Sequence, residues 1–246
     1  MSSLSEFDAA FARCPLIAIL RGVTPGEVVA VGEVLFDAGF RVIEVPLNSP
    51  EPLESIERLA KAFAGRAVIG AGTVLRATEV TAVRNAGGTM IVSPNTNVGV
   101  IAATKSSGLV SLPGFATPSE AFAALEAGAT ALKLFPAEGA SPAVLKAIRA
   151  VLPAGVRVLP VGGITPGDMQ RWLDAGAAGF GIGSALYSPS VALDEIARRA
   201  RTFVAVWPLT RHASGSSVAS TTTTTDSGGK QALTGPVVVN NDEPRN

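Results

Sequence analysis

A regular alternation of glycines and apolar stretches runs through most of this 246-residue chain. Seven glycines lie 20 to 27 residues apart by subtraction of their positions, and each is followed within two residues by four to six mostly apolar residues. A glycine just past a helix adopts the left-handed conformation at little cost, which ends the helix and lets a strand begin. Strands are therefore predicted at residues 15–20, 40–45, 67–71, 89–93, 109–112, 130–135, 156–161 and 178–183.

Helix starts repeat between these strands. Three segments share one pattern, Thr24-Pro-Gly-Glu27, Thr117-Pro-Ser-Glu120 and Thr165-Pro-Gly-Asp168. We expect the threonine to cap each helix, the proline to take the first helical position and the acid to meet free backbone amides. Continuous apolar strands separated by helices are typical of a parallel sheet covered by helices. Eight such units predict the α/β class and a (β/α)8 TIM barrel, with a doubly wound open sheet as the alternative.

The composition changes near the end of this repeat. Residues 1–209 are predicted to form a single barrel domain. Residues 210–246 are rich in Ser, Thr, Gly and Asn, and they bury too little apolar surface to offset the entropy of ordering. A low-complexity, disordered tail is therefore expected there.

Charge and residue counts exclude several classes of function. Twenty basic residues balance twenty acidic ones, so the totals indicate neither a nucleic-acid partner nor an anionic membrane surface. No apolar run has the length of a membrane span, and the one cysteine, Cys14, permits no internal disulfide, so a cytoplasmic protein is expected. The one histidine, His212, lies in the predicted tail. We expect no cofactor, no metal and no histidine-based triad, although composition leaves a carboxylate-only metal site open.

Two ionisable residues stand out within predicted strands. Lys133 lies in the apolar residues 130–136, and Glu44 lies in residues 40–45. Burial disfavours an ammonium ion, and the neutral amine that results is a nucleophile toward carbonyl carbon. A lysine and a carboxyl near the ends of buried strands therefore predict Schiff-base chemistry, with an acid/base close by.

Other residues recur at the carboxyl ends of the predicted strands, where barrel enzymes carry their catalytic groups. The candidate substrate-binding residues are Arg21, Thr73, Pro94 and Phe135. Backbone amides after the last two strands of a barrel often bind phosphate, and glycine lets the phosphate approach them. The candidate phosphate-binding residues are Gly162, Gly163, Gly183 and Ser184.

Each candidate also has a purely structural explanation. A lysine near a strand end can extend its amine to water, and Glu44 can pair with Arg21 or Arg41. Thr73, Ser184 and the candidate glycines are residue types that commonly form turns, and Phe135 can serve only to pack against its neighbours. The functional interpretation is favoured because all of these groups gather at one mouth of one barrel, which the structural explanations do not predict.

Seven segments, in order, resemble one enzyme family. They are PLIAILRG at 15–22, VIEVPLNSP at 42–50, IGAGTV at 69–74, VSPN at 92–95, LKLFP at 132–136, VGGI at 161–164 and GIGS at 181–184. Over about residues 7–207 the chain resembles the 2-keto-3-deoxy-6-phosphogluconate/6-phosphogalactonate aldolases, class I aldolases that form pyruvate. The resemblance implies a Schiff base on Lys133, acid/base catalysis by Glu44, a phosphorylated keto sugar acid as substrate and a homotrimer.

The residues after Glu44 divide this family. Gluconate-type members resemble Glu-Val-Thr-Leu-Arg-Thr here, whereas this chain has Glu44-Val-Pro-Leu-Asn-Ser49 and carries Arg21 after its first strand. The pattern favours cleavage of 2-dehydro-3-deoxy-6-phosphogalactonate to pyruvate and D-glyceraldehyde 3-phosphate. The alternatives are the 6-phosphogluconate epimer or 4-hydroxy-2-oxoglutarate as substrate, a barrel sugar-phosphate isomerase, and a non-catalytic phosphate-binding protein.

Overall fold

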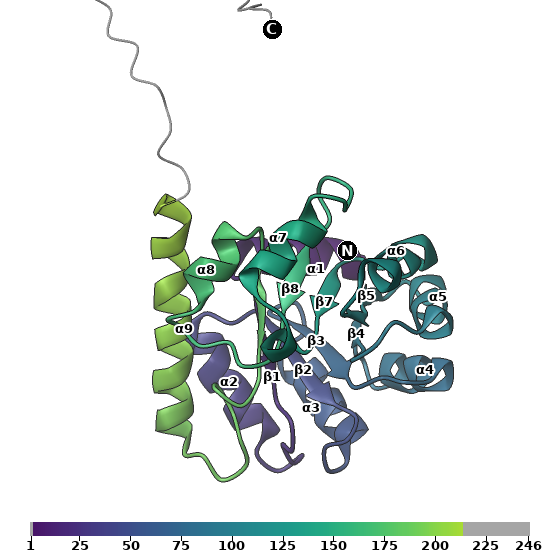
Figure 1. Ribbon diagram of the computed structural model, residues 1–246. Coiled ribbons are helices and arrows are strands. Elements are labelled where there is room, and N and C mark those ends of the chain that lie inside the picture. Colours follow the sequence, from purple (N-terminus) through teal and green to yellow (C-terminus); the bar gives the residue numbers. More distant parts are fainter. Residues whose placement is uncertain (1, 214–246) are drawn as a thin grey trace, which may run out of the picture. The chain divides into compact units, whose positions relative to one another are not determined.

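The computed structural model describes residues 2–213, with side chains as far as residue 207. Parallel strands alternate with helices in this part of the chain, and the helices surround the strands (Figure 1). The elements are α1 (Ser3–Arg13), β1 (Leu16–Ile19), α2 (Val28–Ala38), β2 (Val42–Pro46), α3 (Pro52–Ala62), β3 (Val68–Gly72), α4 (Ala77–Asn85), β4 (Met90–Val92), α5 (Val98–Ser106), β5 (Val110–Leu112), β6 (Gly114–Phe115), α6 (Pro118–Ala127), β7 (Leu132–Leu134), the 3-10 helix η1 (Ala137–Gly139), α7 (Pro142–Arg149), β8 (Val158–Pro160), α8 (Met169–Asp174), β9 (Phe180–Ile182) and α9 (Leu193–Ala213).

Every strand predicted from the repeat is present, with bounds that differ from the prediction by at most two residues. Gly39 and Gly128 end α2 and α6 in the left-handed conformation, with φ of 118° and 101°. The repeat did not predict β6, a two-residue segment that Pro113 separates from β5. Proline has no backbone N–H to donate, so it interrupts a strand ladder.

The helix starts follow the whole predicted pattern in one of the three segments, and in the Thr24 segment only the acid does so, since Glu27 Oε1 accepts from the Thr24 amide at 3.0 Å. The Thr117 side chain caps α6 and forms a capping box with Glu120. The prediction is wrong at Thr24 and Thr165, because α2 and α8 begin only after the acid that ends each segment. Both of these segments carry glycine at their third position, where α6 has serine. Glycine disfavours helix, which accounts for the later start.

The strands form two parallel sheets, in the orders β5-β4-β3-β2-β1-β9 and β6-β7-β8. Hydrogen bonds link them at both edges. The Thr130 amide donates to the Ser111 carbonyl at 2.9 Å, and the Ala178 amide donates to the Val158 carbonyl at 2.9 Å. The architecture is an α/β fold with a curled parallel sheet.

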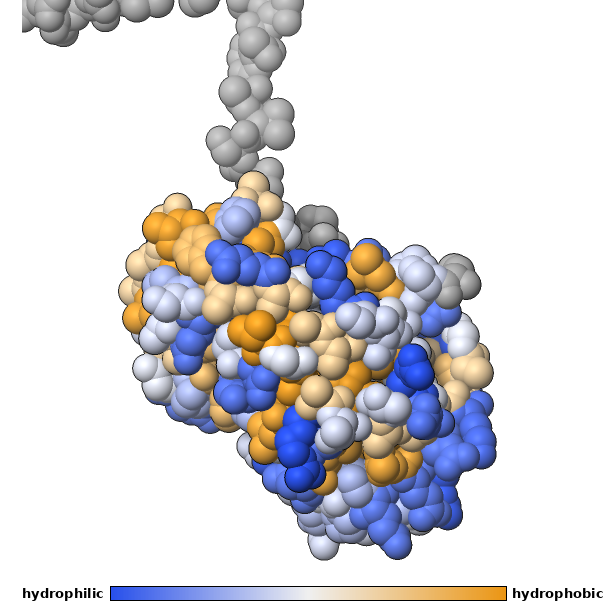
Figure 2. Space-filling view, turned by 90° about the vertical axis from the view of Figure 1, so that its right-hand side faces the viewer, coloured by the Kyte–Doolittle hydropathy of each residue, from blue (hydrophilic) through white to orange (hydrophobic). Residues whose placement is uncertain are grey.

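Helices α4, α5 and α6 lie next to one another on one side of the strands (Figure 1). Figure 2 faces this side and shows apolar side chains that reach the surface between polar ones. The exposed large apolar side chains along this part of the chain are Leu75 at 46%, Val98 at 53% and Phe122 at 38%. Apolar surface is therefore present on the outer face of these helices.

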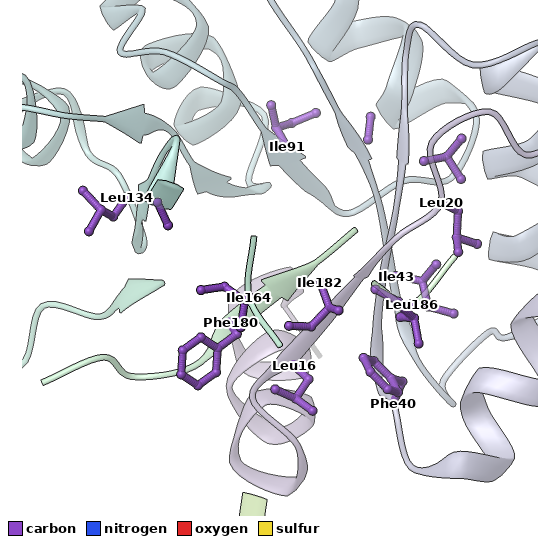
Figure 3. Packing of buried hydrophobic residues seen from close by; sticks show 14 of the residues in the cluster. Leu16, Leu20, Phe40, Ile43, Ile91, Leu134, Ile164, Phe180, Ile182 and Leu186 are labelled. Atoms are coloured by element: carbon purple, nitrogen blue, oxygen red, sulfur yellow. The ribbon is translucent and has the colours of Figure 1, made fainter. Parts of the chain in front are cut away.

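Two buried clusters hold the described residues together, and alternation along each strand separates them. Leu16 and Ile43 belong to the outer cluster between strands and helices, part of which Figure 3 shows. Ile17 and Val42, their neighbours in the same strands, belong to the inner cluster. Helix α1, which the repeat did not predict, adds Phe7 to the inner cluster and packs against β2, β3 and β5. This helix covers the amino ends of the strands.

The predicted tail lies, from residue 214 on, outside the described residues. Helix α9 ends at Ala213. Among the described helices, none combines the length and apolar character that a membrane span requires.

Candidate active site

Lys133 is the middle residue of β7. Both of its neighbours in this strand belong to the outer cluster, so alternation turns the lysine side chain inward. The residue is 6% exposed, and its Nζ lies 4.8 Å from the centre of the Phe135 ring. Burial is the main cause that lowers the pKa of Lys133, while Glu44 opposes this change and Arg21 adds to it. The amine is thereby a better nucleophile than a lysine in water.

Glu44 reaches the same interior from β2. The residue is 2% exposed, and its Oε2 accepts no hydrogen bond from the described residues. Burial raises the pKa of Glu44, against the opposing charges of Lys133 and Arg21. Gly72 leaves room for the carboxyl group, because a β-carbon at this position would lie 2.8 Å from Glu44 Oε1. Glu44 is therefore a buried carboxyl that can hold or accept a proton.

Two cavities meet at the lysine. A small one of about 10 Å³ is lined by Glu44, Lys133 and apolar side chains, and it offers about the space of one water molecule. A wide cleft of about 830 Å³ is lined by Lys133 and by the loops after β1, β7, β8 and β9. Lys133 lines both cavities, so this residue borders the small space beside Glu44 as well as the wide cleft.

Arg21 follows β1 and brings a positive charge to this cleft. The described residues give its guanidinium no hydrogen-bond acceptor and no ion-pair partner. The loop that carries it is fixed, because the Gly22 amide donates to Ser49 Oγ at 3.0 Å. The backbone beside Arg21 is therefore anchored, and the guanidinium is available to a carboxylate in the cleft.

Seven of the ten predicted residues line the wide cleft, and Glu44 lines the small cavity beneath it. The seven are Arg21, Lys133, Phe135, Gly162, Gly163, Gly183 and Ser184. Within the described chain, no backbone carbonyl accepts a hydrogen bond from the amides of Gly163, Gly183 or Ser184. These amides are available to an anion.

Thr73 and Pro94 line neither cavity. Both lie at the carboxyl ends of strands, Thr73 after β3 and Pro94 after β4. Thr73 has a φ of 56°, an uncommon conformation for a residue other than glycine. The substrate contacts predicted for these two residues remain predictions.

Sequence reasoning missed several residues of the cleft. Glu138 on η1 and Tyr187 after β9 both line it. The Tyr187 hydroxyl donates to Glu27 Oε1 at 3.2 Å, which ties the loop after β9 to the segment before α2. Burial, followed by the charge of Glu27, raises the pKa of Tyr187. Neither residue carried a signal in the sequence, since both fall in loops without a periodic pattern.

The acidic residues of this region do not form a ligand set for a metal. Glu44 faces the small cavity, whereas Glu138 faces the cleft. Among the side chains of residues 2–207, no three His, Cys, Asp or Glu residues are grouped to hold a metal ion.

Several known proteins are similar to this chain in sequence, and solved structures are similar to it in fold. A family model described as KDPG and KHG aldolase matches residues 7–200. The 2-dehydro-3-deoxy-6-phosphogalactonate aldolase of Escherichia coli (strain K12) is 46% identical over 192 residues, which cover 78% of this chain and 94% of the relative. A probable 2-dehydro-3-deoxy-6-phosphogalactonate aldolase of Rhizobium meliloti (strain 1021) is 42% identical over 193 residues, or 78% and 91% of the two chains.

A solved structure agrees with these matches. It is described as a native KDPGal structure, and it has a TM-score of 0.80 and 44% identity over 81% of this chain and 97% of its own. The family expected from the sequence segments is thereby confirmed. The chain belongs to the KDPG and KHG aldolase family and is a carbon–carbon lyase.

Proposed function

We propose that this protein cleaves 2-dehydro-3-deoxy-6-phosphogalactonate to pyruvate and D-glyceraldehyde 3-phosphate through a Schiff base on Lys133. The observation that carries this proposal is that buried Lys133 lines both an open cleft and the small cavity that buried Glu44 also lines. Relatives that share 46% and 42% identity and are named for this activity support the choice of substrate.

The reaction begins with the nucleophile. Neutral Lys133 attacks the C2 carbonyl of the substrate, and the carbinolamine loses water to give an iminium ion. Removal of the C4 hydroxyl proton then breaks the C3–C4 bond. Its electron pair forms an enamine, and C4 becomes the aldehyde that leaves. Protonation at C3 and hydrolysis of the imine release pyruvate and restore the amine.

Glu44 moves the protons in these steps. Dehydration needs an acid, and cleavage needs a base within reach of the C4 hydroxyl, directly or through one water. A raised pKa brings a carboxyl closer to the pH at which it both gives and takes protons. The small cavity beside Glu44 fits a water that would relay them.

The two ends of the substrate have different partners. Arg21, without a partner in the described residues, is suited to the C1 carboxylate. The amides of Gly163, Gly183 and Ser184 are suited to the phosphate, since amide donors at loop–helix junctions bind anions. Thr73 and Pro94 are proposed contacts of the reacting carbons.

Preference for the galactonate epimer is the sharpest test of this assignment. Turnover of the galactonate and gluconate substrates is measured side by side, with pyruvate release as the readout. We expect kcat/KM to favour the galactonate epimer. Preference for the gluconate epimer would assign the other substrate, and equal values would contradict a preference for the galactonate epimer. Turnover of neither, combined with phosphate binding, would support a non-catalytic protein.

The two sheets together make a closed (β/α)8 barrel in this proposal. The Thr130 amide, just before β7, donates to the Ser111 carbonyl of β5 at 2.9 Å at one junction. A parallel bridge pairs Val161 with Gly181 at the other. Both contacts support closure, which would shield the lysine from bulk water on all sides except the cleft.

A homotrimer is the proposed assembly. The apolar side chains of Leu75, Val98 and Phe122, which belong to the segment that runs from just before α4 to α6, are exposed. Exposed apolar patches favour contact with another subunit. Analytical ultracentrifugation tests this proposal, and a single species at three times the 24.9 kDa chain mass is expected. A Val98→Glu variant should sediment as a smaller species, while a monomeric wild-type protein would contradict the assembly.

A further inference from the structure

Glu138 is a carboxylate in the cleft that the mechanism above does not use. It lies on η1, which follows the strand of Lys133 after two residues. The side chain is exposed and lines the cleft together with Lys133 and Gly162. The described residues give it neither a hydrogen-bond donor nor an ion-pair partner. Its carboxylate is therefore not tied to any one protein group within the described residues.

The Glu138 side chain lies against the glycine pair after β8. A β-carbon on Gly162 would overlap Glu138 Oε2 and lie 2.8 Å from its Cδ. A β-carbon on Gly163 would lie 2.7 Å from Glu138 Cγ. Gly183, in the other predicted phosphate loop, has no atom within 4 Å of a β-carbon. The space over the glycine pair is thus taken by a carboxylate, whereas the space over Gly183 is open.

This contact gives a second reason for glycine at positions 162 and 163. Sequence reasoning attributed both glycines to the close approach of a phosphate. Their φ angles of 112° and 63° favour glycine in any case, and the neighbour that a side chain would meet first is Glu138. An anion bound at the Gly163 amide would lie close to this carboxylate.

We propose that Glu138 weakens the binding of phosphate groups in the cleft, so that the phosphorylated aldehyde product leaves faster. This inference rests on the proposed function. A phosphate group carries about −1.5 to −2 charges at pH 7, and Glu138 adds a like charge beside it. Solvent screens the repulsion because the cleft is open. Removal of the charge should strengthen phosphate binding by about three- to tenfold.

Inhibition by inorganic phosphate tests the proposal in the full-length protein. Glu138→Gln removes the charge and keeps the shape, and it should lower the Ki of phosphate about three- to tenfold. The KM for an analogue without the phosphate group should stay unchanged. Glu126→Gln, on the exposed face of α6, is the matched control for net charge and should leave the Ki unchanged. Thermal melting verifies that each variant is folded.

The outcomes separate this inference from the proposed function. A Ki that is unchanged or raised in Glu138→Gln would overturn the role of Glu138. An equal fall of the Ki in Glu126→Gln would also overturn it, since net charge alone would then account for the effect. Trapping of pyruvate on unmodified protein by borohydride is independent of Glu138. Its failure would refute the proposed function instead.

Discussion

Gly72→Ala should disable the site by displacing Glu44. The new β-carbon would lie 2.8 Å from Glu44 Oε1, 2.9 Å from its Cδ and 3.2 Å from its Oε2. Ordinary van der Waals contact begins at 3.4 Å, so the carboxyl group must retreat by about 0.6 Å, the difference between 3.4 and 2.8 Å. The φ of Gly72 lies outside the left-handed region, so alanine fits its backbone without strain.

The expected loss is therefore catalytic more than structural. Overpacking of an interior lowers the free energy of unfolding by about 1–3 kcal/mol, whereas replacing glycine with alanine at a compatible position raises it by about 0.4–1 kcal/mol. A net loss of about 0–2.6 kcal/mol lowers the Tm of a domain this size by less than about 10 °C. Misplacement of a catalytic group by about 1 Å costs about 100-fold, so a shift of this size should lower kcat by about 10- to 100-fold.

The assay is pyruvate release at saturating substrate, with Tm measured on the same samples. Gly26→Ala is the matched control, because the nearest atom to its β-carbon is Thr24 Oγ1 at 3.9 Å. It should keep wild-type kcat. A Gly72→Ala protein with kcat within about twofold of wild type would refute the claim that catalysis depends on the observed position of Glu44.

Four further results are expected. Glu44→Gln should fold, bind pyruvate and lose about 10²- to 10⁴-fold in turnover. Burial raises the folded-state pKa of Glu44, so its stabilising contribution is present below 4.5 and is lost as pH rises. The difference in Tm between Glu44→Gln and wild type should therefore shift in favour of the variant as the pH rises from about 4 to about 8. The rate of pyruvate trapping should rise with pH and level off below 10.5, the usual pKa of lysine, because burial lowers the pKa of Lys133. Arg21→Ala should raise the KM with a smaller change in kcat.

The sequence predicted the strands and the central pair of residues because both depend on local pattern. Apolar runs behind glycines specify buried strands, and an ionisable residue inside such a run is costly unless it has a use. Lys133 and Glu44 met this criterion and proved to be buried. The helix starts at Thr24 and Thr165 failed because glycine within the first turn outweighs a good capping residue.

Contacts between distant segments lay beyond sequence reasoning. Gly72 looks like an ordinary turn residue until the carboxyl beside it is located. Glu138 follows a proline in a short turn, which is typical of a solvated surface residue. Its position over Gly162 depends on how β7 and β8 pair. Such juxtapositions follow from register and loop path, which periodicity does not specify.

Covalent capture of pyruvate identifies the lysine that forms the Schiff base. The protein is incubated with pyruvate and borohydride, digested, and mapped by mass spectrometry. We expect the reduced adduct on Lys133 and none in Lys133→Arg, because a guanidinium stays charged. An adduct on Lys61, Lys105 or Lys146 with Lys133 unmodified would contradict this expectation.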